Sequence, residues 1–332
     1  MNDVLDETDL RVLHALQIEP RAAWSDLAPA VGVDAATIAR RWARLQDAGI
    51  AWITGYSNHG QGALLEVECD LAALDDVAGA LQRDPSVVVL DHASGSRDLL
   101  ALVQTPDMAS LSSYAVRRLG GLEGIRAVRT HLTNELLIEA SSWRLRALDA
   151  DEVARIRPPR PPRPRAGAHV PEELTRALLN ELWTDGRMSI TALAERTGFG
   201  PQRIADAIAT LRQRGDLRLR ADLARGFTGW PIYTWYFVEA PARVVDAARH
   251  AIRSVPEVRL AMTAASRYNL ILAVWLRTLA DVNRFEIALE TALQGARIAD
   301  RAVVLRISKQ MGRSVGADTR AISLVSGPFG TL

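Results

Sequence analysis

The sequence contains very little cysteine, lysine or net charge. Cys69 is the single cysteine among 332 residues, so no internal disulfide can form, and this predicts a reducing, cytoplasmic setting. Lys309 is the single lysine, and arginine supplies the other basic side chains. Because the formal net charge is only +1, any surface that attracts nucleic acid has to be local.

Long apolar runs and catalytic signatures are also missing. Apolar runs such as residues 270–276 are far shorter than the roughly 20 residues of a membrane helix, and the acidic residues 1–7 do not resemble a signal peptide. There is no phosphate-binding loop, no serine nucleophile motif and no Cys/His cluster with metal-ligand spacing. We therefore expect no metal, no cofactor, no membrane partner and no enzymatic activity.

The chain does contain an internal repeat. Residues 26–33 and 192–199 share a leucine-alanine pair followed by a glycine turn. Further apolar and glycine positions match at one constant offset of 166 residues, pairing Leu13, Leu16, Ile38, Leu45 and Gly49 with Leu179, Leu182, Ile204, Leu211 and Gly215. A repeat at this spacing predicts two copies of one structural unit.

Each copy begins with three short predicted helices. In the first copy they cover about residues 10–18, 25–31 and 34–48, with Gly32 in the turn and Asp34 as the N-cap of the third. Three short helices with a glycine turn before the last one are typical of a helix-turn-helix. The second copy has matching helices at residues 174–182, 191–197 and 201–214.

A strand-rich segment follows in each copy. After a short strand at residues 50–56, the first copy alternates strands and helices in the order βαββαβ, at residues 64–70, 74–81, 87–90, 99–103, 108–119 and 127–138. The second copy repeats the order, at residues 233–238, 243–254, 258–263, 270–276, 279–293 and 302–307. This order indicates a ferredoxin-like domain. The predicted fold class is α+β, with two copies of a helix-turn-helix followed by a ferredoxin-like domain.

The clearest boundary is a stretch in which proline alternates with arginine. Proline fixes φ and lacks a backbone donor, so residues 156–165 predict an extended linker. Its arginines either lie in solvent or contact DNA phosphates; they are Arg155, Arg157, Arg160, Arg163 and Arg165. The predicted domains are residues 1–56, 62–145, 150–168 (the linker), 169–226 and 230–315.

The third helix of the first copy has the features of a DNA-reading helix. Its apolar face is formed by Ile38, Trp42 and Leu45, and the remaining face predicts a set of exposed residues, namely Ala36, Thr37, Arg40, Arg41 and Arg44. Small residues at the start of such a helix permit close approach to the major groove, and arginines contact base edges and phosphates. A solvated charged face is the alternative interpretation.

The second copy differs at the same positions. Gln202, Asp206, Ala207 and Thr210 replace Ala36, Arg40, Arg41 and Arg44, while Arg203 stands opposite Thr37. The apolar positions persist, so the fold is retained while positive charge is lost. We therefore predict that the first copy reads DNA and that the second is weak or structural.

These motifs resemble the Lrp/AsnC family of feast/famine regulators. The resemblance rests on residues 25–56, including the Thr-Ile-Ala-Arg-Arg run at 37–41, and on the Gly-x-x-Asp-Leu turn at residues 95–99. Each of the two copies resembles the family, so the resemblance extends over nearly the whole chain, and the first copy is the closer match. The resemblance implies a tandem-duplicated transcriptional regulator that binds double-stranded DNA and works as a homodimer or higher oligomer.

The resemblance also implies a site for a small effector, often an amino acid. Sensing domains of the family pair through their sheets, and effectors bind near the Gly-x-x-Asp turn. Carried over, this indicates Gly95, Arg97 and Asp98 in the first copy, and Ser266 and Asn269 in the second. For Asp98, a purely turn-forming role is the equal alternative.

Two other function classes stay open at this point. Sirohaem decarboxylases are built from two Lrp-like halves, and residues 267–270 faintly resemble one of their strand motifs. No histidine lies in residues 262–272, and a DNA-reading helix would serve no purpose in such an enzyme. The third class is a ligand sensor or assembly protein that does not bind DNA.

Overall fold

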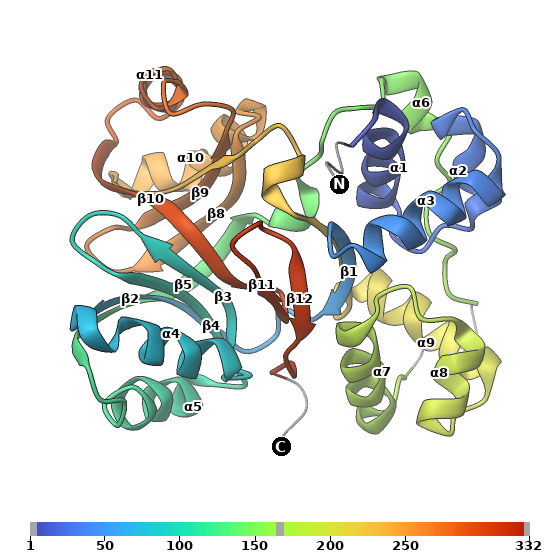
Figure 1. Ribbon diagram of the computed structural model, residues 1–332, viewed down its shortest axis with the longest axis horizontal. Helices are drawn as coiled ribbons and strands as arrows, with labels where there is room; N and C mark the ends of the chain where they lie inside the picture. The colour runs from blue at the N-terminus through green and yellow to red at the C-terminus, as the bar shows by residue number, and fades with distance from the viewer. Residues whose placement is uncertain (1–4, 164–168, 329–332) are drawn as a thin grey trace. The chain divides into compact units, whose positions relative to one another are not determined.

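The computed structural model describes residues 5–163 and 169–328 (Figure 1). The chain forms two compact units, and each is interrupted in sequence by the other. Residues 5–59 and 144–224 build the first, which holds both helix-turn-helix domains. Residues 60–143 and 225–328 build the second, which holds both ferredoxin-like domains. The α+β fold class predicted from the sequence is confirmed.

The first helix-turn-helix consists of α1 (Glu7–Ile18), α2 (Trp24–Val31) and α3 (Ala35–Asp47). Asp34 caps α3 as predicted, because its carboxylate accepts a hydrogen bond from the Thr37 amide at 2.8 Å. Gly32 ends α2 with φ of 84°, a left-handed conformation that favours glycine. The predicted apolar face of α3 is fully buried, so the orientation of its opposite face follows from the sequence pattern.

The second helix-turn-helix repeats this arrangement with α7 (Glu172–Thr184), α8 (Ile190–Thr197) and α9 (Pro201–Arg214). Gly198 takes the same left-handed turn as Gly32, with φ of 74°. A strand follows each third helix: β1 (Ala51–Tyr56) and β6 (Arg218–Leu223) pair with each other in antiparallel register. The sequence pattern did not predict β6, because charged and apolar residues alternate irregularly through it.

The segment after the first ferredoxin-like domain returns to the first helix-turn-helix. The amides of Leu145 and Leu148 donate hydrogen bonds to Gln17 and to Nδ1 of His14, at 2.8 and 2.9 Å. The predicted linker at 150–168 begins with a short helix, α6 (Ala150–Ala154), which lies ahead of the stretch at 156–165 that was predicted to be extended. An acidic capping box explains this helix, since Asp149 and Glu152 satisfy each other's backbone donors.

The buried His14 predicts a stability change in mildly acidic solution. Burial, with Arg144 and Arg146 nearby, lowers the pKa of His14 from 6.5 to about 4. The unfolded chain therefore takes up this proton at higher pH than the folded chain, so stability is lost as the pH falls from about 6.5 towards 4. We expect urea midpoints at pH 7 and pH 5 to differ less in His14→Gln than in the parent chain. His169→Gln, at an exposed position, serves as the control and should keep the parent's difference.

In the second unit, each ferredoxin-like domain has a four-stranded antiparallel sheet. The first domain orders its strands β3-β4-β2-β5, that is Val87–Ala93, Leu99–Thr105, Gln61–Cys69 and Ile125–Ile138. Helices α4 (Leu74–Arg83) and α5 (Met108–Ser113), with a π-helical turn at Tyr114–Arg118, cover one face (Figure 1). This is the predicted βαββαβ order.

The second domain follows the same plan. Its sheet order is β8-β9-β7-β10, that is Val258–Ala265, Leu270–Leu276, Ile232–Glu239 and Arg297–Gln310. Helices α10 (Ala242–Ala251) and α11 (Asp281–Ala292) pack on it, and two short strands, β11 (Arg313–Val315) and β12 (Ala321–Leu324), extend from β10.

The two sheets are joined at both edges by the long strands β5 and β10. The first part of β5 pairs with β2, and its last part pairs with β8 of the other domain. Likewise, β10 begins against β7 and ends against β3. The hydrogen-bond ladder therefore returns to its start, and the two domains of one chain pair with each other, as the family resemblance implied.

No helix within residues 5–163 and 169–328 is long and apolar enough to span a bilayer.

Candidate functional site

The structure places four of the five predicted DNA-contacting residues on the open side of α3. Ala36, Arg40 and Arg44 are exposed, and Thr37 is half-buried. Arg40 lies one turn beyond Thr37 and meets its hydroxyl at 3.4 Å. Arg41 is turned instead towards the start of α1.

Two carboxylates at the start of α1 hold the arginines of α3. Arg41 Nη1 lies 2.7 Å from Asp6 Oδ2 and 2.8 Å from Asp9 Oδ1, and Arg44 Nη2 lies 2.6 Å from Asp9 Oδ2. The Asp6 and Asp9 carboxylates raise the pKa of Arg41 above its ordinary value. Sequence reasoning missed these pairs because they join residues 32 to 35 positions apart, although the acidic start of α1 was visible. Arg40 thus points outward, whereas the guanidinium groups of Arg41 and Arg44 are held by the carboxylates of α1.

On α9 of the second copy, two of the matching positions are not on the surface. Ala207 is 4% exposed and Thr210 is 2% exposed, and Ala207 belongs to the apolar core with Leu174 and Ile208. These two positions therefore pack inside the domain, which their match to Arg41 and Arg44 in the sequence did not indicate. The small side chain of Ala207 allows α9 to pack closely on α7. At the equivalent position of the first copy, Arg41 instead pairs with the carboxylates of Asp6 and Asp9. Gln202 and Arg203 are exposed as expected.

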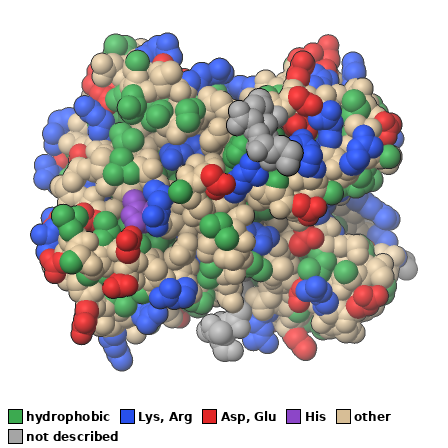
Figure 2. Space-filling view, viewed as in Figure 1, with side chains coloured by type: hydrophobic (Ala, Val, Ile, Leu, Met, Phe, Trp, Pro, Cys, Tyr) green, Lys and Arg blue, Asp and Glu red, His purple; other side chains and the backbone are tan. Residues whose placement is uncertain are grey.

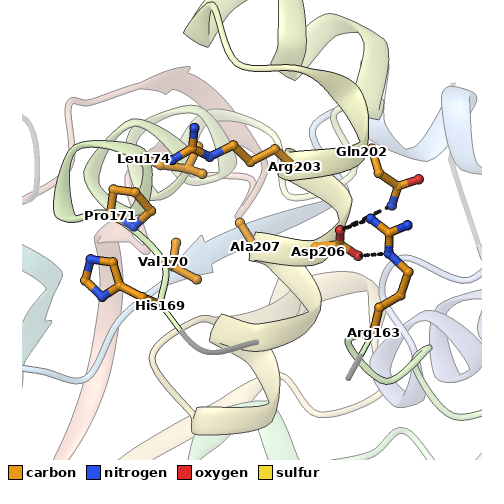
Figure 3. Close-up of a pocket in the computed structure, with 9 residues that line it drawn as sticks. All are labelled: Arg163, His169, Val170, Pro171, Leu174, Gln202, Arg203, Asp206 and Ala207. Atoms are coloured by element: carbon orange, nitrogen blue, oxygen red, sulfur yellow. Dashed lines mark hydrogen bonds and ion pairs between the residues drawn. The ribbon is translucent and has the colours of Figure 1, made fainter. Parts of the chain in front are cut away.

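The linker lies against the exposed side of α9. Figure 3 shows Arg163 facing Asp206, with a bidentate pair at 3.1 Å from Nε and 2.6 Å from Nη2, and with Gln202 on the same carboxylate. Arg163 holds the pKa of Asp206 below its ordinary value, through its hydrogen bonds. These residues border a cavity of about 350 Å³, closed on its other side by residues 169–171 and Leu174. On α9, the position that matches Arg40 of α3 is thus contacted by the chain itself, through Arg163.

Two further linker arginines also contact the protein. Arg155 donates to the Pro29 carbonyl at 3.3 Å, and Arg157 lies 3.4 Å from Asp26. Arg165 lies outside the described residues. Figure 2 shows positive and negative side chains interspersed over the face drawn, without a broad surface of one sign. On this face, any DNA-binding surface must therefore be local.

The Gly-x-x-Asp turn has a structural role that is repeated in both copies. Asp98 accepts a hydrogen bond from the Cys69 amide at 2.7 Å, at the end of β2. Asn269 does the same at the end of β7, accepting from the Ala240 amide at 3.0 Å and donating to its carbonyl at 2.8 Å. Both side chains tie the turn to the end of a neighbouring strand, and this favours the turn-forming interpretation of Asp98. Gly95, with φ of 98°, stays exposed at the tip of the turn.

Arg97, which was predicted to meet an effector, is buried in an ionic cluster. It is 4% exposed, lies 2.6 Å from Glu66 Oε2, pairs with Asp300, and stacks over the Phe237 ring at 4.6 Å. His131 joins the cluster through Glu66 at 2.6 Å. Because Asp300 and Phe237 belong to the second ferredoxin-like domain, Arg97 links the two domains rather than facing solvent.

Both ring nitrogens of His131 are engaged. Nε2 meets Glu66, and Nδ1 lies 2.9 Å from Oγ of Ser266, whose hydroxyl also reaches the Tyr268 carbonyl at 2.9 Å. Ser266, the other residue predicted to bind an effector in the second copy, therefore also takes part in contacts between the two domains. The sequence signal for this cluster was an inward-facing glutamate and histidine on adjacent strands.

Comparison with known proteins agrees with this architecture. The chain matches the AsnC-type helix-turn-helix domain over residues 5–46, the Lrp/AsnC ligand binding domain over residues 62–142, and a winged helix-turn-helix DNA-binding domain over residues 171–215. It is 30% identical over 145 residues to the leucine-responsive regulatory protein of Rhizobium meliloti, covering 88% of that relative and 39% of this chain. The chain belongs to the Lrp/AsnC family.

The relatives of this Lrp/AsnC protein match less than half of its length. The proline dehydrogenase transcriptional activator of Rhodobacter capsulatus is 28% identical over 153 residues, which is 98% of that relative and 43% of this chain. Over the full length, the structure resembles the sirohaem decarboxylase NirDL, solved with an iron-uroporphyrin III analogue. The TM-score is 0.57 at 16% identity, covering 92% of this chain and 93% of NirDL. At this identity the likeness concerns the fold alone.

Proposed function

We propose that this Lrp/AsnC protein is a sequence-specific transcriptional regulator that reads double-stranded DNA through α3. The observation that carries the proposal is the exposed face of α3, where Arg40 projects beside the small residues Ala36 and Thr37, and where Arg44 is exposed although it pairs with Asp9. Small residues at the start of the helix allow close approach to the major groove, and the arginines supply hydrogen bonds to base edges or phosphates. Two relatives named as regulators support this proposal.

Each chain supplies one reading helix in this proposal. The matching face of α9 contacts Arg163, and two of its positions are buried, so a palindromic operator needs two chains about one helical turn or a multiple apart. A homodimer or higher oligomer is therefore part of the proposal. A small effector, such as an amino acid, would act on the paired ferredoxin-like domains by binding one assembly state better than another.

Sequencing of genomic fragments bound by the purified full-length chain tests the proposal. We expect fragments to be enriched that share a motif with two related half-sites, because one reading helix per chain requires two chains. The same binding reaction without protein provides the background. Recovery of fragments without a shared motif at physiological salt would contradict sequence-specific reading, and recovery of no DNA above the background would favour a sensor that does not bind DNA.

The full-length likeness to NirDL makes a sirohaem decarboxylase the second candidate. We propose that the chain is not such an enzyme, because no histidine lies in residues 262–272, beside the faint strand motif, and because α3 keeps an exposed Arg40 that such an enzyme would not need. Titration of the protein with sirohaem discriminates the two functions. A saturable shift of the Soret band at one equivalent would support the enzyme, whereas an unchanged spectrum of free sirohaem agrees with the regulator.

A further inference from the structure

The two helix-turn-helix domains contact each other through a reciprocal pair of arginines. Arg21 donates to the carbonyls of Gly186 and Met188, at 2.7 and 2.8 Å. Arg187, which lies 166 positions later and is its repeat equivalent, donates to the carbonyls of Pro20 and Ala22, at 2.6 and 2.9 Å. Each arginine thus holds the connection between the first two helices of the other domain. This reciprocity is the arrangement of a symmetric dimer interface, built within one chain.

Further contacts close the same interface. Arg187 stacks over the Trp24 ring at 3.7 Å, at the first residue of α2. Arg212 of α9 forms a bidentate pair with Glu19, at 2.9 and 2.8 Å, and the Glu19 side chain is only 5% exposed. Planar two-point pairs of this kind fix orientation as well as distance. The end of α1 and the start of α2 are therefore held by side chains of the second domain.

The backbones of the two domains also come into direct contact. The Gly186 amide donates to the Ile53 carbonyl at 2.8 Å, beside the six-residue pairing of β1 with β6. A Cβ on Gly55 would lie 2.6 Å from Cβ of Leu182, so the strand lies directly on α7 with no room for a side chain. Burial lowers the pKa of Arg187 to about 10, which leaves the guanidinium charged at neutral pH. Such close, desolvated contact favours one fixed arrangement of the two domains.

We propose that the second helix-turn-helix is an intramolecular positioning domain, and that Arg187 and Arg21 are its positioning residues. Arg187 satisfies two carbonyls at the connection between α1 and α2, and α2 in turn packs against α3. Without this support, the connection has two unsatisfied carbonyls and α3 loses its fixed orientation. The second helix-turn-helix differs from the first on the exposed face of its third helix, but its interface side chains support the first domain. This inference rests on the proposed function, because α3 is the helix to be oriented.

DNA affinity of Arg187→Ala in the full chain tests the inference, with Arg203→Ala as the matched control. Arg187 is half-buried at the interface, whereas Arg203 is exposed on α9 of the same domain. We expect Arg187→Ala to lose about tenfold in affinity with an unchanged salt slope, because no phosphate contact is removed. Arg187→Lys should not restore the affinity, since an ammonium lacks the two-point geometry. Arg203→Ala should bind like the parent.

Charge exchange between Glu19 and Arg212 provides a second test if Arg187→Ala does not fold. Glu19→Arg and Arg212→Glu should each weaken DNA binding, and the double exchange should restore it, because the pair then forms in reverse. Circular dichroism verifies that each compared variant is folded. Parent-like affinity in folded Arg187→Ala, or in both single exchanges, would overturn the inference while leaving the proposed function intact.

Amide hydrogen exchange separates this inference from the proposed function. If the parent chain binds no DNA, the proposed function fails, but exchange of the α1–α3 amides still reports on the support. We expect Arg187→Ala to exchange faster at residues 19–24 and along α3, and Arg203→Ala to match the parent. Unchanged exchange in α3 of the Arg187 variant would contradict positioning by the second domain.

Discussion

Arg40→Ala is expected to weaken DNA binding about tenfold to a hundredfold, the range for loss of one arginine contact to a base edge. Arg40 projects from the open side of α3, one turn after the small residues at its start. If its contact is to a phosphate instead, affinity falls for all sequences alike, and the slope of log affinity against log salt decreases by about one. Binding measured at several salt concentrations, with operator and non-operator DNA, distinguishes the two roles.

Arg203→Ala is the control for this prediction because it removes an exposed arginine from the first turns of α9, the repeat equivalent of α3. The face of α9 is contacted by Arg163, and Asp206 stands at the position of Arg40. We therefore expect Arg203→Ala to change neither the affinity nor the salt slope. Equal losses in the two variants would mean that both domains contact DNA, and would contradict the proposed asymmetry.

Glu66→Ala is expected to destabilise the paired ferredoxin-like domains by about 3 kcal/mol, because it removes a buried carboxylate that contacts two other buried side chains, although Arg97 keeps Asp300 as a partner. Glu66 is 2% exposed and contacts both Arg97 and His131. Arg97 contacts the carboxylates of both Glu66 and Asp300, and alanine at position 66 would leave Asp300 alone beside the buried guanidinium. Denaturant unfolding followed by the fluorescence of the buried Trp235 and Trp275 measures this loss.

Glu68→Ala provides a matched control on the same strand, two residues further along. Glu68 pairs with Arg129, but this arginine is 53% exposed, and solvent-exposed pairs contribute only about 0–1 kcal/mol. We expect its unfolding midpoint to stay near that of the parent chain. A small effect at both positions would show that the Glu66 cluster does not hold the two domains together.

Local sequence signals predicted the elements well where they were complete. For α9, the proline at its start and the glycine after its end gave both boundaries. The same holds for β9, a continuous apolar run between a turn and a polar segment. By contrast, β6 was missed because its strand character comes from pairing with β1, which lies far away in the sequence.

The candidate site was predicted in part, and the errors have one common origin. The exposure of Ala36, Arg40 and Arg44 followed from helix periodicity, which is a local property. The burial of Ala207 and Thr210 did not, because it depends on how closely α9 packs on its neighbours. Carboxylates at the start of α1 pair with Arg41 and Arg44, and Asp300 pairs with Arg97. Helix or strand periodicity cannot predict these partners, because they lie far away in the sequence.

The amino-acid sequence by itself determined that this protein has two copies of one unit, where their helices and strands lie, and which copy keeps an arginine-rich third helix. Repeat spacing, capping residues and apolar periodicity act within a few residues of the chain, so they can be followed without a structure. Only the tertiary structure decided that the two helix-turn-helix domains also pair, so that they form one unit while the two ferredoxin-like domains form the other. These pairings depend on hydrogen bonds and ion pairs between residues more than a hundred positions apart, and no local pattern specifies which distant group satisfies a buried charge or strand edge.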